Sequence, residues 1–109
     1  MSAFKAINDE SFDESVLKSS TPVLVEFGAE WCGPCRQMEP LLEQMLSAEW
    51  NGKLHLAKID VDESINTTMQ FQVQSVPTLI LFVNGEARQR LSGKQPRDRL
   101  VEKFSPYLP

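Results

Sequence analysis

The amino-acid sequence predicts an α/β fold, with a central mixed sheet of about five strands flanked by about four helices. Short β-branched and apolar runs alternate along the chain with segments whose apolar residues recur at helical spacing. Near the end, Asn84 and Gly85 separate two strand-like runs, and both residue types accept the positive φ of a two-residue hairpin turn. We therefore expect parallel strands joined by helices, then an antiparallel hairpin, with both faces of the sheet covered.

The first elements are a strand, a helix and a second strand. Residues 4–7 form a short possible strand, and Asn8 or Asp9 can cap a helix over residues 12–17, whose apolar spacing suits one buried face. Residues 23–27 read Val-Leu-Val-Glu-Phe, a run typical of a buried strand with one acidic exception.

The next predicted element is a helix from residue 35 to about residue 49, where apolar residues recur at helical spacing. Pro40 interrupts it, because proline lacks one N–H bond and crowds the carbonyl of Arg36. We expect a kink at this position, with two shorter helices as the alternative.

The second half repeats the alternation. A proline just inside a helix is compatible with its first turn, so Pro96 places the start of the last helix. The expected elements are a strand at 53–60, a short helix near 64–70, hairpin strands at 78–83 and 86–92, and a final helix reaching about residue 104.

Length and charge limit the function classes. The 109 residues fit one domain, 1–109, that can bury a core without staples. The net charge is -4, and the basic residues near the end are expected on a solvated face, so we expect no nucleic-acid partner. No run approaches the roughly 20 apolar residues of a membrane span. We expect a monomer without a membrane partner and, with no export pattern in the first ten residues, a cytoplasmic location.

The two cysteines, Cys32 and Cys35, hold all the thiol chemistry of the chain. If Cys35 lies in the first turn of a helix, the two Cα atoms can approach to the roughly 4.4 to 6.8 Å that a disulfide requires. A helix N-terminus also favours the thiolate of the first cysteine, which makes Cys32 the better nucleophile. This spacing predicts redox exchange, and a disulfide formed in a reducing compartment is more often catalytic than structural.

Three other interpretations compete with redox exchange for the cysteine pair. Two unlinked buried cysteines would not explain the i, i+3 spacing around Gly33 and Pro34. A structural zinc site needs four ligands as a rule, and beyond the cysteines the chain offers one histidine, His55, so carboxylates or a second chain would have to contribute. A structural disulfide closing so short a loop would constrain the unfolded chain little.

Residues 23–35, which end in WCGPC, closely resemble the thioredoxin family, and the resemblance continues at Pro40, 76–78, Asn84-Gly85 and Gly93 over nearly the whole chain. It implies a thioredoxin fold and a protein thiol-disulfide oxidoreductase that reduces disulfides in protein substrates. It also implies re-reduction by an NADPH-dependent thioredoxin reductase. No bound cofactor and no metal are expected, because the two sulfurs store the electrons.

The resemblance also assigns roles to individual residues. Cys32 matches the attacking cysteine, Cys35 the resolving one, and Pro77 a cis-proline that faces the disulfide. The residues that match an apolar surface for docking substrate backbone are Trp31, Gly33, Pro34, Val76 and Gly93. A core position is the alternative for Trp31, whereas Trp50 is expected to pack under a helix end.

Two residues depart from the family pattern. Glu26 stands where the family usually has a buried aspartate, and Gly28 where many members have a tryptophan. Burial raises the pKa of a carboxyl group, so Glu26 can relay a proton to or from Cys35, and Lys58 matches the partner of that acid. The longer side chain can approach the sulfurs, bend toward Lys58, or be merely tolerated; Gly28 can open a groove or loosen the loop.

Rival functions share the same fold. Pro34 favours a reductase, whereas oxidases and isomerases of this fold usually carry histidine near that position. A thioredoxin-fold binding module, in which the surface matters more than the thiols, is the second class of function. Zinc binding is the third.

Overall fold

The computed structural model of the chain describes residues 2–109. Within this range, five strands form one sheet in the spatial order β1-β3-β2-β4-β5. The strands are β1 (Phe4–Ile7), β2 (Val23–Gly28), β3 (His55–Asp60), β4 (Thr78–Val83) and β5 (Glu86–Ser92). The helices are α1 (Gly33–Ala48), α2 (Ile65–Gln70) and α3 (Arg97–Phe104), with a short π-helical segment η1 (Asp13–Leu17) and a 3-10 turn η2 (Ser105–Tyr107).

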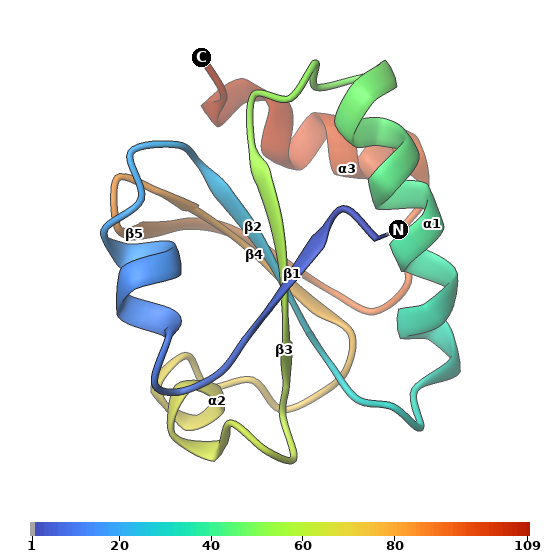
Figure 1. The fold of residues 1–109 in the computed structure, drawn as a ribbon. Coiled ribbons are helices and arrows are strands. Elements are labelled where there is room, and N and C mark those ends of the chain that lie inside the picture. Colours follow the sequence, from blue (N-terminus) through green and yellow to red (C-terminus); the bar gives the residue numbers. More distant parts are fainter. Residues whose placement is uncertain (1) are drawn as a thin grey trace.

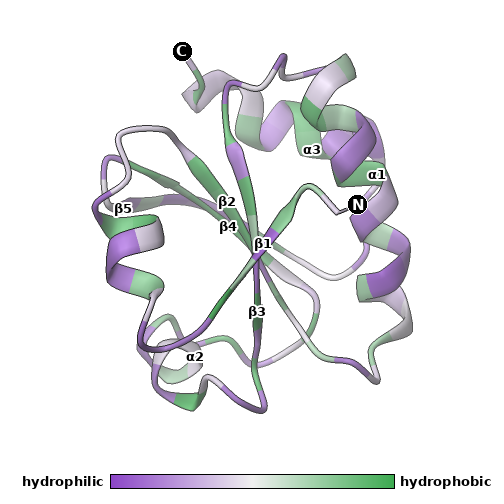
Figure 2. Ribbon diagram, viewed as in Figure 1, coloured by the Kyte–Doolittle hydropathy of each residue, from purple (hydrophilic) through white to green (hydrophobic). Residues whose placement is uncertain are grey.

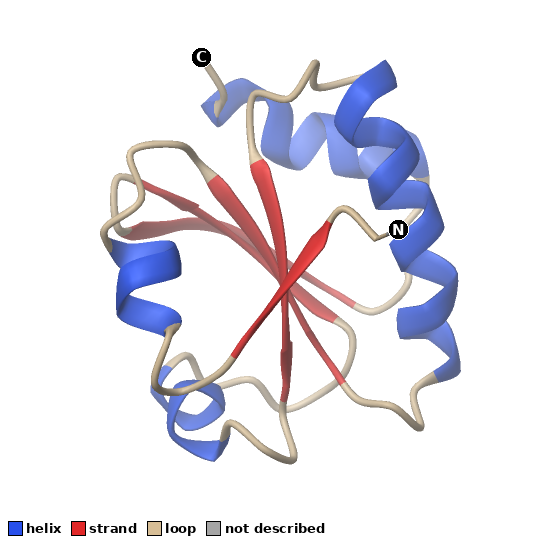
Figure 3. Ribbon diagram, in the orientation of Figure 1, coloured by secondary structure: helices blue, strands red, loops and turns tan. Residues whose placement is uncertain are grey.

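The sheet separates two apolar layers. Helices α1 and α3 lie on one side of it, and η1 and α2 lie on the other (Figure 1; Figure 3). Apolar residues concentrate along the strands and on the helix faces turned toward them (Figure 2). Leu24 packs with residues of α1 and α3, whereas Val23, Val25 and Phe27 pack in the opposite cluster with Phe12 of the N-terminal segment. Because alternate strand residues share a face, Glu26 and Gly28 point with Leu24 toward the α1 side.

The strand directions correct one expectation. Strands β1, β3 and β2 run parallel, but β4 runs antiparallel to β2, so the predicted parallel arrangement stops after three strands. Helix α1 has 16 residues, or about 24 Å, which is enough to carry the chain back along a strand of about 20 Å. Helix α2 has six residues, or about 9 Å, so β4 starts from the end of the sheet at which β3 stops.

Helix α1 begins two residues earlier than predicted, at Gly33, with Cys32 as its N-cap. It continues through Pro40 to Ala48 as one helix, so the alternative of two shorter helices is wrong. The loss of one N–H bond at Pro40 is offset by the burial of Met38 and Leu42 on the face that meets the sheet.

The predicted first helix is reduced to the five-residue η1, and neither proposed cap residue caps it. Asn8 Oδ1 accepts the N–H groups of Glu10 and Ser11 in the preceding turn. Asp9 instead accepts the N–H groups of Asn66 and Thr67 at the start of α2. A polar residue before an apolar periodic run signals a cap, but tertiary structure decides which helix it serves.

Two other local predictions are confirmed. Asn84 and Gly85 have φ angles of 50° and 79°, as the hairpin turn requires. A β-carbon at Gly85 would lie 2.7 Å from the carbonyl oxygen of Leu17, so this turn also needs glycine for space. Trp50 is buried beyond the end of α1, where its indole N–H donates to Ser105 Oγ at 2.9 Å.

Candidate active site

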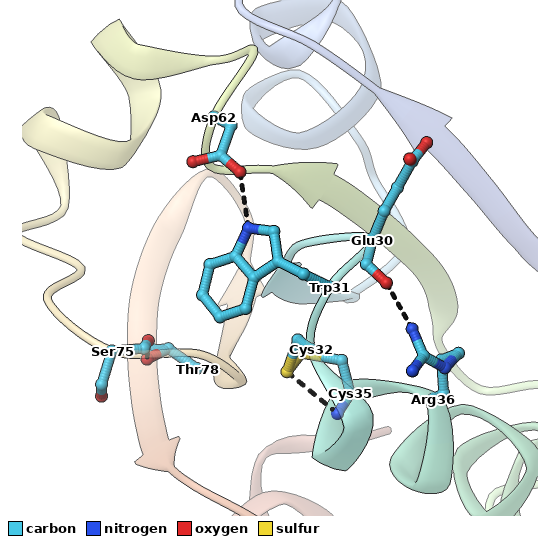
Figure 4. Close-up of a disulfide and its surroundings, with 8 residues drawn as sticks. All are labelled: Glu30, Trp31, Cys32, Cys35, Arg36, Asp62, Ser75 and Thr78. Atoms are coloured by element: carbon cyan, nitrogen blue, oxygen red, sulfur yellow. Dashed lines mark hydrogen bonds between the residues drawn. A yellow bond between two sulfur atoms is a disulfide. The ribbon is translucent and has the colours of Figure 1, made fainter.

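The cysteine pair lies where β2 passes into α1. Cys32 and Cys35 form a disulfide with a Cα–Cα distance of 5.3 Å, as the spacing predicts. Cys32 is the N-cap of α1, and the backbone N–H of Cys35 donates to Cys32 Sγ at 3.1 Å (Figure 4). Both residues are buried to a similar degree, so exposure does not distinguish them. Their positions on α1 distinguish them, because the N–H donor directed at Cys32 Sγ and the helix dipole together stabilise a thiolate on that sulfur.

The loop before the disulfide presents an aromatic surface. The Trp31 side chain is 67% exposed, which excludes the core position. Its indole N–H donates to Asp62 Oδ2 at 2.8 Å, and this bond orients the ring beside the disulfide (Figure 4). On the other side of the loop, Arg36 donates to the carbonyl oxygen of Glu30. No pattern in the sequence pointed to Asp62, because the contact joins two loops 31 residues apart.

A turn from Ser75 to Thr78 also belongs to the surroundings of the disulfide (Figure 4). The Val76–Pro77 peptide bond is cis, as the resemblance implies. Gly93, with a φ of 82°, donates its N–H to the Pro77 carbonyl oxygen at 2.8 Å and so joins the end of β5 to this turn. Pro77 is buried, Val76 and Gly93 are partly exposed, and Pro34 is exposed at the start of α1.

Glu26 lies beneath the disulfide on β2. It is 1% exposed, as predicted for this strand. A β-carbon built at Gly28 would lie 3.1 Å from Cys35 Sγ and 3.8 Å from Glu26 Oε1, so the space left by the missing side chain of Gly28 borders both the carboxyl and the sulfur. Burial raises the pKa of Glu26 to about 9, with a hydrogen bond and the charge of Glu39 adding to the rise and Lys58 opposing it. At neutral pH the Glu26 carboxyl is therefore mostly protonated.

Lys58 takes a different partner from the one that the sequence suggested. It stands opposite Glu26 in the β2–β3 register, but its Nζ forms an ion pair with Glu39 Oε1 at 3.5 Å. Glu39 lies on α1, four residues after Cys35, and sequence reasoning missed it. The signal was present, since residues four apart share a helix face and the first of the two, Cys35, is the predicted resolving cysteine.

The geometry disfavours the zinc interpretation. His55 pairs with Val23 at the start of β2, whereas the cysteines follow Gly28 at its end. Among residues 2–109, no group of three or more His, Cys, Asp and Glu side chains is placed to hold a metal ion. In the same range, no helix is both long and apolar enough to cross a membrane.

Comparison with known proteins agrees with this geometry. A protein-family model named Thioredoxin matches residues 3–105. The chain is 46% identical over 109 residues to the thioredoxin of Mycolicibacterium smegmatis, covering 98% of this chain and 96% of that protein. The chain belongs to the thioredoxin family.

Other relatives of the thioredoxin family differ in length. The chain is 40% identical over 108 residues to the thioredoxin of Synechocystis sp., covering 99% of this chain and 100% of that protein. It is 42% identical over 104 residues to "Thioredoxin M-type, chloroplastic" of Pisum sativum, where the match covers 95% of this chain but 60% of that protein. The predicted family and its fold, a five-stranded mixed sheet with helices on both faces, are confirmed.

Proposed function

We propose that this protein reduces disulfides in other proteins through a reversible dithiol/disulfide pair, Cys32 and Cys35. The observation that carries the proposal is the disulfide itself, placed at the N-terminus of α1 in a chain of the thioredoxin family. The two sulfurs exchange two electrons, so the reaction needs no bound cofactor.

The first step is attack by the Cys32 thiolate on a substrate disulfide. A mixed disulfide forms between Cys32 and one substrate sulfur, and the other substrate sulfur leaves as a thiolate that takes up a proton. The Cys35 N–H and the α1 dipole support this assignment, because they stabilise the thiolate form of Cys32.

The second step is attack by Cys35 on Cys32 Sγ. The small ionised fraction of Glu26 acts as the base in this step: its carboxylate accepts the thiol proton of Cys35, the substrate leaves as its second thiolate, and the Cys32–Cys35 disulfide forms. The substrate has then gained two electrons, and it takes up two protons. The raised pKa makes the Glu26 carboxylate a stronger base while keeping most of Glu26 protonated at neutral pH, and the charge of Lys58 favours the ionised form through space.

Substrates dock on the apolar surface around the disulfide. Trp31 supports this part of the proposal most directly, since it is 67% exposed and tryptophan is enriched at protein interfaces. The other residues that we assign to this surface are Gly33, Pro34, Val76, Pro77 and Gly93, of which the last two are joined by a hydrogen bond.

An NADPH-dependent thioredoxin reductase is the proposed electron donor, and a reducing compartment such as the cytoplasm is the proposed location. The relatives are bacterial, cyanobacterial and chloroplast proteins, so location is tested separately. Alkylation of thiols in intact cells, after acid quenching, should recover mainly the reduced form of the pair. Recovery of mainly the disulfide would contradict this location.

The proposed function is tested by a coupled assay. The protein, NADPH and a thioredoxin reductase should reduce insulin disulfides, Cys32→Ser should abolish turnover, and Cys35→Ser should accumulate a mixed disulfide with insulin. If Cys35→Ser still turns over, the assignment of the two cysteines is wrong. If the wild-type protein reduces nothing but binds protein partners, it is a binding module.

The direction of transfer is measured by equilibration with glutathione. A reductase should have a reduction potential below the cytosolic glutathione poise. A value well above that poise would indicate an oxidase or isomerase instead.

A further inference from the structure

The carboxyl of Glu26 presents an unsatisfied hydrogen-bonding group. In the described part of the chain, its Oε2 is the one buried side-chain polar atom to which no donor is directed. A buried oxygen without a partner costs about 1 to 3 kcal/mol, more when it is charged. Such a group calls for an explanation within its own surroundings.

The elements packed around Glu26 differ in what they can offer to its unpaired carboxyl oxygen. On β3, Lys58 is opposite Glu26 in register, but its Nζ is engaged with Glu39. On β4, the paired residue is Leu79, which offers no polar group. On α1, the neighbouring groups are Cys35 and Glu39: the ion pair with Lys58, which stands opposite Glu26, brings the Glu39 carboxyl to this place, and a hydrogen bond and the charge of Glu39 both raise the pKa of Glu26.

Two carboxyl groups can form a hydrogen bond only if one of them carries a proton, because a carboxylate is purely an acceptor. A single proton between Glu26 and Glu39 therefore supplies the missing partner. With this proton, Glu26, Glu39 and Lys58 together carry no net charge. The two carboxyl groups hold one proton, and the remaining negative charge lies on Glu39 beside the Lys58 cation.

Exposure gives the arrangement a direction. Glu26 is 1% exposed, whereas the Glu39 and Lys58 side chains are 24% and 43% exposed. Glu26 therefore lies on the side of Cys35, across the space at Gly28, and Glu39 lies on the side of the solvent.

We propose that Glu39 is a positioning residue for the proton of Glu26: the two carboxyl groups share one proton beneath the disulfide, and the Lys58 ion pair holds Glu39 in place. The inference rests on the proposed function, in which Glu26 accepts the proton of Cys35. Glu39 acts through Glu26 and touches no reacting sulfur.

The sign of the effect follows from charge. With Glu39 ionised, a second carboxylate at Glu26 would be repelled, so Glu39 favours the protonated form of Glu26. In E39Q this repulsion is gone, and the amide can donate a hydrogen bond to the Glu26 carboxylate. The titration of Glu26 should then shift down by about one pH unit or more. In K58M the loss of the cation should shift it up.

The test is a carbon-13 NMR titration of the glutamate carboxyls in the oxidised protein, in which no thiol titrates. The resonance absent from E26Q identifies Glu26. Compared with wild type, the pH at the inflection of the Glu26 titration should be lower in E39Q and in E39A, higher in K58M and unchanged in E43Q. The last variant is the matched control, because it removes the same charge from α1 one turn further along, where Glu43 contacts the N-terminal segment at Ala3.

A kinetic readout accompanies the titration. A lower inflection leaves more Glu26 carboxylate at pH 7, so E39Q should resolve the mixed disulfide up to about tenfold faster than wild type. A Glu26 titration in E39Q and E39A that superimposes on wild type overturns the shared proton. Because both variants keep Cys32 and Cys35, that result would leave disulfide reduction standing, whereas failure of the proposed function appears in the wild-type coupled assay.

Discussion

Replacing the buried Glu26 by glutamine should stabilise the folded protein at neutral pH and remove one component of its pH dependence. In the fold, burial raises the pKa of Glu26 from 4.5 to about 9. In the unfolded chain the carboxyl returns to its ordinary value. Between these two values the folded state binds a proton that the unfolded state does not.

The sign and size of the effect follow from this difference. The protonated carboxyl contributes its full stability below pH 4.5, and the contribution is lost as pH rises toward the folded-state value of about 9. Between pH 4.5 and pH 7 the loss extends over about 2.5 pH units, and at about 1.4 kcal/mol per unit it amounts to about 3 to 4 kcal/mol. Glutamine has no proton to lose, so Glu26→Gln escapes this loss.

Urea unfolding of the oxidised wild type and Glu26→Gln between pH 5 and pH 9 measures the difference directly. The free energy of unfolding of the variant minus that of wild type should increase by about 1.4 kcal/mol per pH unit. This difference should level off above about pH 9. Glu26→Leu should show the same slope with another offset, because the slope comes from the wild-type carboxyl. Parallel curves for wild type and both variants would refute the reasoning.

Three further predictions concern other contacts. In Gly28→Ala, the new methyl group meets Cys35 Sγ at 3.1 Å, which the disulfide holds in place while a thiol can turn away. The disulfide should become about fivefold easier to reduce against glutathione, and equal destabilisation of both redox forms would contradict this. Asp9→Ala should lower the melting temperature at pH 7, and the difference should vanish as pH falls below 3.8, because hydrogen bonds from Thr67 lower the pKa of Asp9. Trp50→Phe should cost about 1 to 3 kcal/mol in urea unfolding through loss of ring volume and of a buried N–H bond, and an unchanged midpoint would refute this.

Much of the fold could be predicted because its signals are local. The apolar run at residues 23–27 and the turn at Asn84-Gly85 each carry their conformation in their own residues, and both appear as expected. The direction of β4 could not be predicted in this way, because it depends on whether α2 is long enough to span the sheet. The prediction that Asp9 caps the next helix was wrong for a related reason, since its side chain accepts hydrogen bonds at the start of α2, 57 residues further along the chain.

The sequence by itself determined the geometry of the cysteine pair. A Cys-x-x-Cys at a strand-to-helix junction fixes the distance between Cys32 and Cys35 through the geometry of a single helical turn. The acidic residue in an apolar strand likewise marked Glu26 as a buried titratable group.

Only the tertiary structure decided what surrounds that carboxyl. The packing of α1 on the sheet brings Glu39 into an ion pair with Lys58, which stands opposite Glu26, and the missing side chain of Gly28 leaves a space that borders both the Glu26 carboxyl and Cys35. These contacts join residues on separate elements, and their effect on a proton depends on distance and on the exclusion of water. A one-dimensional pattern records neither, so the sequence identified the acid but not the groups that determine when it releases its proton.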